Sequence, residues 1–445
     1  MTDTQTEYTP AGVPPRATQA GEVRTRWAWT EPTVWTERML TALEEGVKGG
    51  VWFSLSDKVS ALRTLRAAWQ HVKANDGAAG VDQVTVAMYE RDVERNLAQV
   101  SQQLRDGTYR PQPVRRTWID KPGSREQRPL GIPTVRDRIV QTALRLVLEP
   151  IFERHFAAQS YGFRPGRGCK DALRRVDALL TGGYTWVVDA DLRSYFDSIP
   201  HQPLLAGVRR HVADGRVLAL LEQFLTQGVM DGLEAWTPDE GTPQGAVVSP
   251  LLANIYLDPL DHDMAAVGFE MVRYADDFVV LCRSGEEAQA ALAEVKAWVE
   301  GNGLSLSPDK THVGDCRQEG QGFEFLGYRF EAGRRWVRRK SFKAIRERIR
   351  MRTKRTRGDS LARIIADLNP TLRGWFNYFK HAHPMTFSGM DGFVRRRLRA
   401  ILRKQEKRPG MGRCRDDHQR WPNTFFATQG LFTMVAAREL ASQSR

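Results

Sequence analysis

The chain has 445 residues, a net charge of +13 and 41% apolar residues, which is an ordinary globular composition. No run of about 18 apolar residues occurs and the first twenty residues are polar, so we expect neither a membrane span nor a signal peptide. The four cysteines form no C-x-x-C pair. This spacing indicates a reducing compartment and argues against a structural zinc site.

The positive charge is concentrated in one late segment of the chain. From Glu331 to Arg420 there are 27 Lys and Arg residues against 8 Asp and Glu residues, with Trp, Phe and Tyr interleaved. The remainder of the chain carries a small net negative charge. A long basic segment with aromatic residues favours a surface for a polyanion over a merely solvated face.

The first third of the chain predicts helices around one hairpin. Residues 1–48 are typical of a flexible polar extension, and apolar residues at helical spacing predict a helix over 58–71. The stretch "GTYRPQPVRRTWIDKPGSREQRPLGIP" predicts a β-hairpin with mobile loops. "DRIVQTALRLVLEPIFERHF" is apolar nearly all round and predicts a buried helix.

The middle third alternates strands with helices. "TWVVDADL" predicts a buried strand that is broken soon afterwards at Pro200, and "GTPQGAVVSPLLANIYLDPLD" predicts a loop that opens a second apolar helix. "MVRYADDFVVLCR" predicts strand–turn–strand, followed by an amphipathic helix in "EEAQAALAEVKAWVEGNGL".

After "FEFLGYRF" the pattern changes to basic helices. In "LNPTLRGWFNYFK" we expect Asn369 to cap a helix and Pro370 to take its first position. Trp375, Phe376 and Phe379 share one face of this helix, so core packing is their expected role. "GFVRRRLRAILRKQ" predicts a further helix with arginines outside its apolar stripe.

Asp276 and Asp277 stand side by side between two apolar runs. A polar turn at a hairpin tip would explain two adjacent acids. Asp191 is a further acid at the end of a β-branched run, and its carboxylate can meet the pair if the two strands are neighbours. Three clustered carboxylates are costly unless cations lie between them. Oxygen ligands suit Mg²⁺, and two such ions about 4 Å apart would clamp an in-line phosphoryl transfer.

Taken together, these motifs resemble the reverse transcriptases of bacterial group II introns. "PLGIPTVRDRIVQ", "SYGFRPGRG", "DADLRSYFD", "TPQG" and "YADD" follow in that order, and "LNPTLRGWFNYF" resembles the thumb, or maturase, domain of the family. The resemblance implies an α+β right-hand polymerase, with fingers and a palm built on an antiparallel sheet, followed by a basic α-helical thumb/maturase domain.

The resemblance also implies four segments. They are a flexible N-terminal extension (1–48), the fingers and palm (49–332), the thumb/maturase (X) domain (333–408) and a short C-terminal DNA-binding-like segment without an endonuclease domain (409–445).

The resemblance assigns Asp191, Asp276 and Asp277 as the catalytic, metal-binding triad. Asp189 is a rival for the first place, since residues i and i+2 share a strand face. Phe196 matches the aromatic gate that abuts the sugar and excludes a 2′-hydroxyl, although core packing would also explain this ring. Asp197 is interpreted as a turn or cap residue.

Further contacts with nucleotide and nucleic acid are implied at cations and loops. Lys121 and Arg128 match the fingers cations that hold the triphosphate, and Arg125 is close enough to be confused with Arg128. Gln244 matches a residue beside the nascent base pair, and Lys310 the lysine proposed to protonate pyrophosphate, although each also suits a solvated loop. The remaining implied contacts are a primer grip at Leu326 and Gly327 and nucleic-acid-binding cations at Arg164, Arg395, Arg396 and Arg397. Arg164 equally suits a surface cation.

The function implied by the resemblance is RNA-directed DNA polymerisation. Two Mg²⁺ ions would help to add dNTPs to a DNA primer on an RNA template, and the protein would also bind its group II intron RNA and target DNA to assist splicing and mobility. We expect a cytoplasmic, bacterial protein associated with the nucleoid or a ribonucleoprotein. Two alternatives are a maturase acting mainly as a splicing cofactor, and a domesticated reverse transcriptase of phage defence or CRISPR spacer acquisition. The intact "YADD" argues against the first, and the lack of an added nuclease or integrase motif weakens the second.

Overall fold

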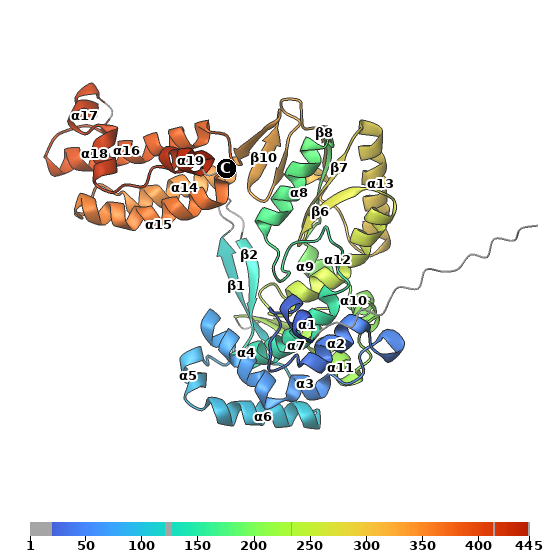
Figure 1. Ribbon diagram of the computed structural model, residues 1–445. Coiled ribbons are helices and arrows are strands. Elements are labelled where there is room, and N and C mark those ends of the chain that lie inside the picture. The colour runs from blue at the N-terminus through green and yellow to red at the C-terminus, as the bar shows by residue number, and fades with distance from the viewer. Residues whose placement is uncertain (1–19, 121–126, 233, 413, 444–445) are drawn as a thin grey trace, which may run out of the picture.

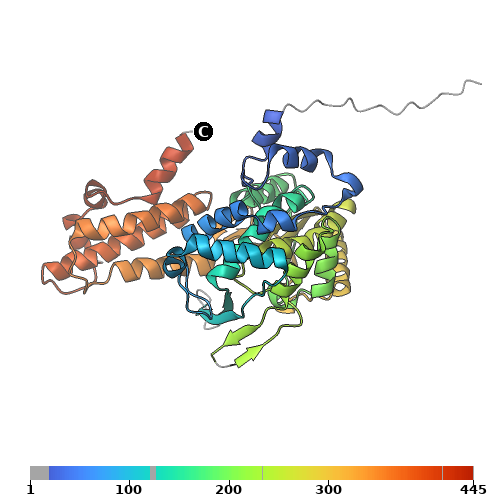
Figure 2. The same cartoon turned by 90° about the horizontal axis from the view of Figure 1, so that it is seen from below.

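The computed structural model describes residues 20–120, 127–232, 234–412 and 414–443. Figure 1 shows a helical lower region, a sheet-containing region above it and a helical arm to one side, with the β1–β2 hairpin rising from the lower region towards the arm. The view from below in Figure 2 shows the arm beside the body. The hairpin of β4 (Val229–Asp231) and β5 (Glu234–Trp236) projects from the body. The predicted α+β fold, ending in a helical domain, is confirmed.

The lower region corresponds to the fingers and is mainly helical. Its elements are α1 (Ala20–Arg26), α2 (Glu37–Glu45), α3 (Ser56–Ser60), α4 (Leu62–Asn75), α5 (Val86–Glu90), α6 (Val93–Asp106), β1 (Val114–Asp120), β2 (Gln127–Ile132) and α7 (Val135–Glu153). The helix expected over 58–71 is divided into α3 and α4 because Ala61 is extended. β1 and β2 form the expected antiparallel hairpin.

Residues 20–48 differ from the expected flexible extension. Trp35 is fully buried, and its indole Nε1 donates to the Leu146 carbonyl of α7 at 2.9 Å. The indole of Trp27 donates to Glu44 at 2.7 Å, which ties α1 to α2. The sequence gives no periodic stripe strong enough to predict this, because the partners lie on an element that is remote in the chain.

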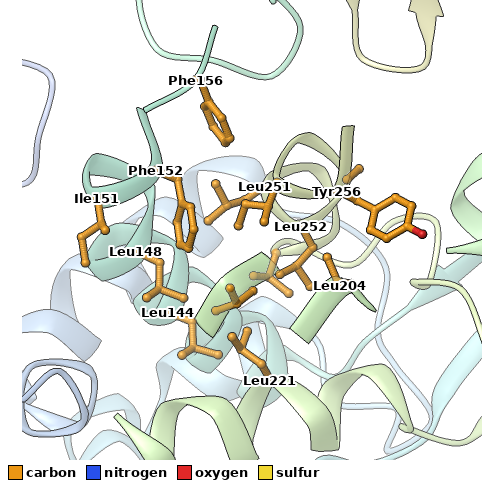
Figure 3. Close-up of a cluster of buried hydrophobic side chains, with 14 of the residues drawn as sticks. Leu144, Leu148, Ile151, Phe152, Phe156, Leu204, Leu221, Leu251, Leu252 and Tyr256 are labelled. Carbon is orange, nitrogen blue, oxygen red and sulfur yellow. The ribbon is translucent and has the colours of Figure 1, made fainter. Parts of the chain in front are cut away.

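The buried helix α7 lies at the centre of the lower core. Leu144, Leu148 and Phe152 point from α7 towards side chains of three further helices (Figure 3). These helices are α10 (His201–Arg209), α11 (Gly215–Leu225) and α12 (Ser249–Ala266). Because α7 is apolar nearly all round, it can pack against partners on several sides at once.

A four-stranded antiparallel sheet forms the palm, with strand order β6-β7-β3-β8. Its strands are β3 (Trp186–Asp191), β6 (Glu270–Tyr274), β7 (Asp277–Cys282) and β8 (His312–Asp315). Side chains alternate between its faces: Val188 and Val280 join the core that contains α12 and α13 (Gly285–Gly301), whereas Val187 and Val279 join the core that contains α8 (Cys169–Thr181). With helices on both faces, the polar groups at the strand ends form the accessible part of the sheet.

Two further sheets, one of four strands and one of three, complete the fold. β1 also pairs in parallel with β4 (Val229–Asp231), which pairs with β5 (Glu234–Trp236). The strands β9 (Phe323–Phe325), β10 (Tyr328–Glu331) and β11 (Arg334–Val337) form an antiparallel sheet that leads into the arm. Short elements near the palm are α9 (Tyr195–Ser198) and η2 (Pro308–Lys310), and η1 (Lys48–Gly50) precedes α3 in the lower region.

The arm corresponds to the expected basic helical domain. Its helices are α14 (Arg339–Arg352), α15 (Leu361–Phe379), α16 (Met385–Gln405), α17 (Arg415–Arg420), α18 (Asn423–Thr428) and α19 (Met434–Gln443). Phe376 and Phe379 are buried, and Trp375 packs against the same core.

The expected helix cap at Asn369 is wrong. α15 begins after Ser360, whose hydroxyl caps it, and continues through Pro370. The Asn369 amide instead donates to the Gly430 carbonyl and accepts from the Phe432 amide, each at 2.8 Å. Asn369 therefore holds the C-terminal segment against the arm.

Among the described residues, no helix is long and apolar enough to cross a membrane.

Candidate active site

The three predicted catalytic carboxylates gather at one end of the palm sheet. In the β3–β7 ladder Asp191 lies directly opposite Asp277, and Asp276 precedes Asp277 in the β6–β7 turn. The rival Asp189 is two pairs further along, opposite Val279 and His312. Lys310 reaches the cluster from η2 and its Nζ lies 2.8 Å from an Asp191 carboxylate oxygen.

The surroundings of Asp276 and Asp277 disfavour negative charge. Burial raises the pKa of Asp276, the charge of Asp191 adds to the rise, and Arg128 acts in the opposite direction. Burial also raises the pKa of Asp277 to about 7, with further contributions from Asp189 and Asp276. Carboxylates held together and away from water are stabilised in their charged form by a cation between them.

A buried arginine holds the turn that carries Asp276. Arg273 and Asp261 are both fully buried, and the guanidinium Nε donates to the two Asp261 oxygens at 2.8 and 3.0 Å. Its Nη1 donates to the Ala275 carbonyl at 2.8 Å and to Asn254 at 3.0 Å. The ion pair therefore fixes the backbone of the turn immediately before the predicted catalytic acids.

Gly162 allows a second backbone to approach the same turn. A Cβ at this position would lie 2.2 Å from the Ala275 amide nitrogen, too close for any side chain. The Gly162 carbonyl accepts from Asn254 at 2.8 Å, and Ala275 itself has a positive φ of 62°. The "SYGF" loop thus acts as a backbone support for the catalytic turn.

Two of the predicted nucleotide-binding residues, Phe196 and Gln244, lie in α9 and in the "TPQG" loop. Phe196 follows the catalytic strand, is half-buried, and packs edge-on to Tyr195. The Gln244 amide donates to Asp197 at 3.3 Å, while its main-chain carbonyl accepts from Gly131 of β2 at 2.7 Å. The loop is therefore bonded to the fingers hairpin. Lys121 and its neighbour Arg125 lie outside the described residues, and Arg128 is exposed.

The predicted primer grip is a strained turn held by the arm. Leu326 and Gly327 join β9 to β10 and have positive φ values of 47° and 85°. The Tyr378 hydroxyl of α15 donates to the Leu326 carbonyl at 2.8 Å. A Cβ at Gly327 would lie 3.3 Å from the Phe379 ring, so the arm packs directly on this turn.

Arg164 is a correction to the predicted nucleic-acid contacts. Its side chain is 2% exposed and forms an ion pair with Glu153 at 2.7 Å. The remaining donors bond to the carbonyls of Phe156, Ala157 and Ser160. All five N–H groups of the guanidinium are therefore used within the protein, and the residue stabilises the loop rather than contacting RNA or DNA.

The predicted arginines of α16 have different surroundings. Arg397 donates to the Thr353 hydroxyl and carbonyl at 3.0 and 2.6 Å, so it caps the end of α14 and is also a structural residue. Arg396 lies over the Phe393 ring at 5.4 Å, and the buried Nε of Arg395 has no hydrogen-bond partner within the described chain. Arg395 and Arg396 stay candidates for contacts with nucleic acid.

Within the described ranges, no group of three or more His, Cys, Asp or Glu side chains is already assembled as a metal site. Asp191 is instead paired with Lys310. The donor chemistry nevertheless fits a hard divalent cation, because Asp191, Asp276 and Asp277 supply carboxylate oxygens at neighbouring strand ends and burial raises the pKa of Asp276 and Asp277. An antiparallel palm with this cluster, between fingers and a helical thumb, defines a right-hand nucleic-acid polymerase.

Comparisons with known proteins narrow this class. Residues 119–330 match the family described as "Reverse transcriptase (RNA-dependent DNA polymerase)", and residues 342–421 match "Group II intron, maturase-specific domain". Protein YkfC of Escherichia coli (strain K12) is 34% identical over 345 residues, which are 68% of this chain and 85% of YkfC. The chain belongs to the reverse transcriptase family, in the group that carries the group II intron maturase domain. Polymerases of this family generally use divalent metal ions, and its maturase members have RNA partners.

Two further matches are more partial. The group II intron-encoded protein LtrA of Lactococcus lactis subsp. cremoris is 40% identical over 196 residues, which are 44% of this chain and 32% of LtrA. The match therefore spans about a third of LtrA. A solved partial Cas6-RT-Cas1--Cas2 complex is 25% identical, with a TM-score of 0.37, and the match covers 56% of this chain and 42% of that one.

Sequence reasoning did not find the residues that support the catalytic turn. Arg273 opens the "RYADD" stretch, and Asp261 lies in a helix that is apolar on most sides. A charged residue inside each of two buried elements was a usable signal, because buried charges are almost always paired.

Proposed function

We propose that the protein joins dNTPs to a DNA primer on an RNA template, with Asp191, Asp276 and Asp277 holding two Mg²⁺ ions. The single observation that carries this proposal is the register of β3 and β7, which sets Asp191 opposite Asp277 and beside Asp276. When bound, Mg²⁺ supplies positive charge to the reacting oxygens. The three carboxylates would hold and orient the metal ions. Asp191 must release Lys310 before its carboxylate can hold a metal ion.

The remaining residues have proposed roles in positioning. Arg128, with Lys121, neutralises the triphosphate, and Gln244 lies beside the nascent base pair. Lys310, once released from Asp191, is placed to give a proton to pyrophosphate. The Leu326–Gly327 turn holds the primer end, supported by Tyr378.

We also propose that the basic arm binds group II intron RNA and assists its splicing and mobility. The match of residues 342–421 to the maturase-specific domain supports this role, as do exposed cations among the arm helices. The proposed domains are fingers and palm over 49–332, with residues 20–48 added to the fingers core, the thumb/maturase domain over 333–408, and a C-terminal segment over 409–445 that packs on it.

Primer extension tests the polymerase proposal directly. Purified protein should extend a DNA primer on an RNA template with Mg²⁺ and dNTPs, chelation by EDTA should abolish extension, and added Mg²⁺ should restore it. Extension that survives chelation would contradict the metal-dependent mechanism. Specific RNA binding without extension at any salt concentration would leave only the splicing role.

The gate role of Phe196 predicts a change in sugar selectivity. Phe196→Ala should lower the preference for dNTPs over NTPs by about 10- to 200-fold, since the clash with one extra hydroxyl is removed. Competing dNTP and NTP incorporation by single-nucleotide extension measures this ratio. Phe196→Tyr keeps the ring and should retain the preference, whereas an unchanged ratio in Phe196→Ala would assign the ring to core packing.

A further inference from the structure

A cavity of about 250 Å³ lies where the palm meets the arm, outside the carboxylate cluster and sharing only Tyr378 with the residues given roles above. We call it the palm–thumb pocket. It is lined by residues of α8, of β10 and β11, and of the C-terminal end of α15 and the residues after it. Three parts of the chain that are remote in sequence therefore form one surface.

Cationic side chains outnumber acidic ones among the residues that line this pocket. Lys170, Arg174, Arg335 and Lys380 line it, against one acid, Asp177. Arg335 is paired with Asp177 at 3.0 Å, and Arg174 is paired with an acid of its own helix. Lys170 and Lys380 are exposed, and within the described residues neither has an ion-pair or hydrogen-bond partner. Two positive charges thus lie at the rim without compensation.

The floor of the pocket is aromatic. Tyr328, Phe330 and Tyr378 line it, and both hydroxyls are already bonded, Tyr328 to the Tyr378 carbonyl at 2.7 Å and Tyr378 to the Leu326 carbonyl at 2.8 Å. Tyr328 and Phe330 are almost fully buried, so the half-buried ring of Tyr378 is the one that presents apolar surface to an occupant. Cations above aromatic rings form the pattern that accepts the phosphates and the sugar or base of a nucleic-acid strand.

The charge of this pocket distinguishes it from the cavity next to Gln244. That cavity has a volume of about 220 Å³ and is lined by Arg116 together with the acids Asp197 and Glu240. Its acids oppose a phosphate, whereas the palm–thumb pocket attracts one.

We propose that the palm–thumb pocket binds a backbone phosphate of an RNA strand, with Lys170 and Lys380 as its cations and the Tyr378 ring against the adjoining nucleotide. This inference rests on the proposed function, because it gives that function a second RNA-binding surface. The strand is either the template or an RNA that is not being copied, and the experiment separates the two.

The salt dependence of RNA binding tests this proposal. Each phosphate contact to single-stranded RNA contributes about 0.7 to the slope of log Kd against log salt, so Lys170→Gln with Lys380→Gln, which removes the one proposed phosphate contact, should lower the slope by about 0.7. The probe is fluorescently labelled polyuridine RNA titrated with full-length protein. Lys73→Gln with Lys296→Gln, on α4 and α13, removes the same charge elsewhere and should leave the slope unchanged.

Other measurements decide the source of the phosphate and keep the test independent of folding. If the strand is an uncopied RNA, the pocket variant should extend a short primer–template at the wild-type rate. If it is the template, the Kd for the primer–template should rise with the rate at saturation unchanged. If wild-type protein and the pocket variant give the same slope, the inference is overturned and the polymerase proposal is unaffected. An equal decrease of the slope in the control variant would also overturn the inference. The inference would also be overturned if the pocket variant differed from wild-type protein only in how inorganic phosphate competes with RNA. Wild-type protein that neither binds RNA nor extends primers would instead refute the proposed function.

Discussion

Asp276→Asn should reduce RNA-templated primer extension by about a thousandfold or more, because a metal-ligand contact is worth several kcal/mol of transition-state stabilisation. The same substitution should leave the folded protein as stable or more stable. Burial raises the pKa of Asp276, so at neutral pH its charge is less favourable in the folded state than in the unfolded one. A neutral amide of the same shape removes that cost.

Opposite changes in activity and stability distinguish a catalytic acid from a structural one. Single-turnover extension and thermal unfolding of metal-free protein measure the two quantities. Asp263→Asn, at an exposed position of α12, is the matched control and should change neither. Loss of activity together with loss of stability in Asp276→Asn would instead support the polar-turn interpretation.

Asp261→Ala should destabilise the protein by about 3–5 kcal/mol, because it leaves the charge of Arg273 buried without its partner. Both side chains of this pair are inaccessible to solvent. The Arg273 guanidinium also holds the Ala275 carbonyl, so primer extension should fall even at temperatures where the variant is folded. Urea unfolding monitored by circular dichroism gives the free energy, and extension at low temperature gives the activity.

Two further variants make the Asp261 result specific. Asp263→Ala removes an exposed acid from the same helix and should cost less than about 0.5 kcal/mol. Asp261→Ala combined with Arg273→Met removes both charges and should recover part of the lost stability. If the double variant is less stable than Asp261→Ala by the full cost of a second core substitution, the buried charge is not the cause.

The sequence by itself determined the class of the protein and the local structure around its acids. Strands with acids at their ends, the "YADD" turn between two apolar runs and a basic late segment are all local patterns. Short runs of β-branched and apolar residues and turn chemistry act over a few residues, so β3, β6 and β7 could be predicted before their partners were known. Both faces of these strands are buried, so their register depends on packing in two cores and was not determined by the sequence pattern.

Only the tertiary structure decided which polar residues are structural and which are free. The donors of Arg164 are all bonded to Glu153 and nearby carbonyls. Asn369 bonds to a segment about 60 residues later, and Trp35 bonds to a carbonyl 111 residues away. An arginine in a loop and an asparagine before a proline look the same in sequence whether exposed or buried. Their roles depend on which remote backbone groups need a partner once the core has formed, because a buried polar group must be satisfied wherever the fold places it.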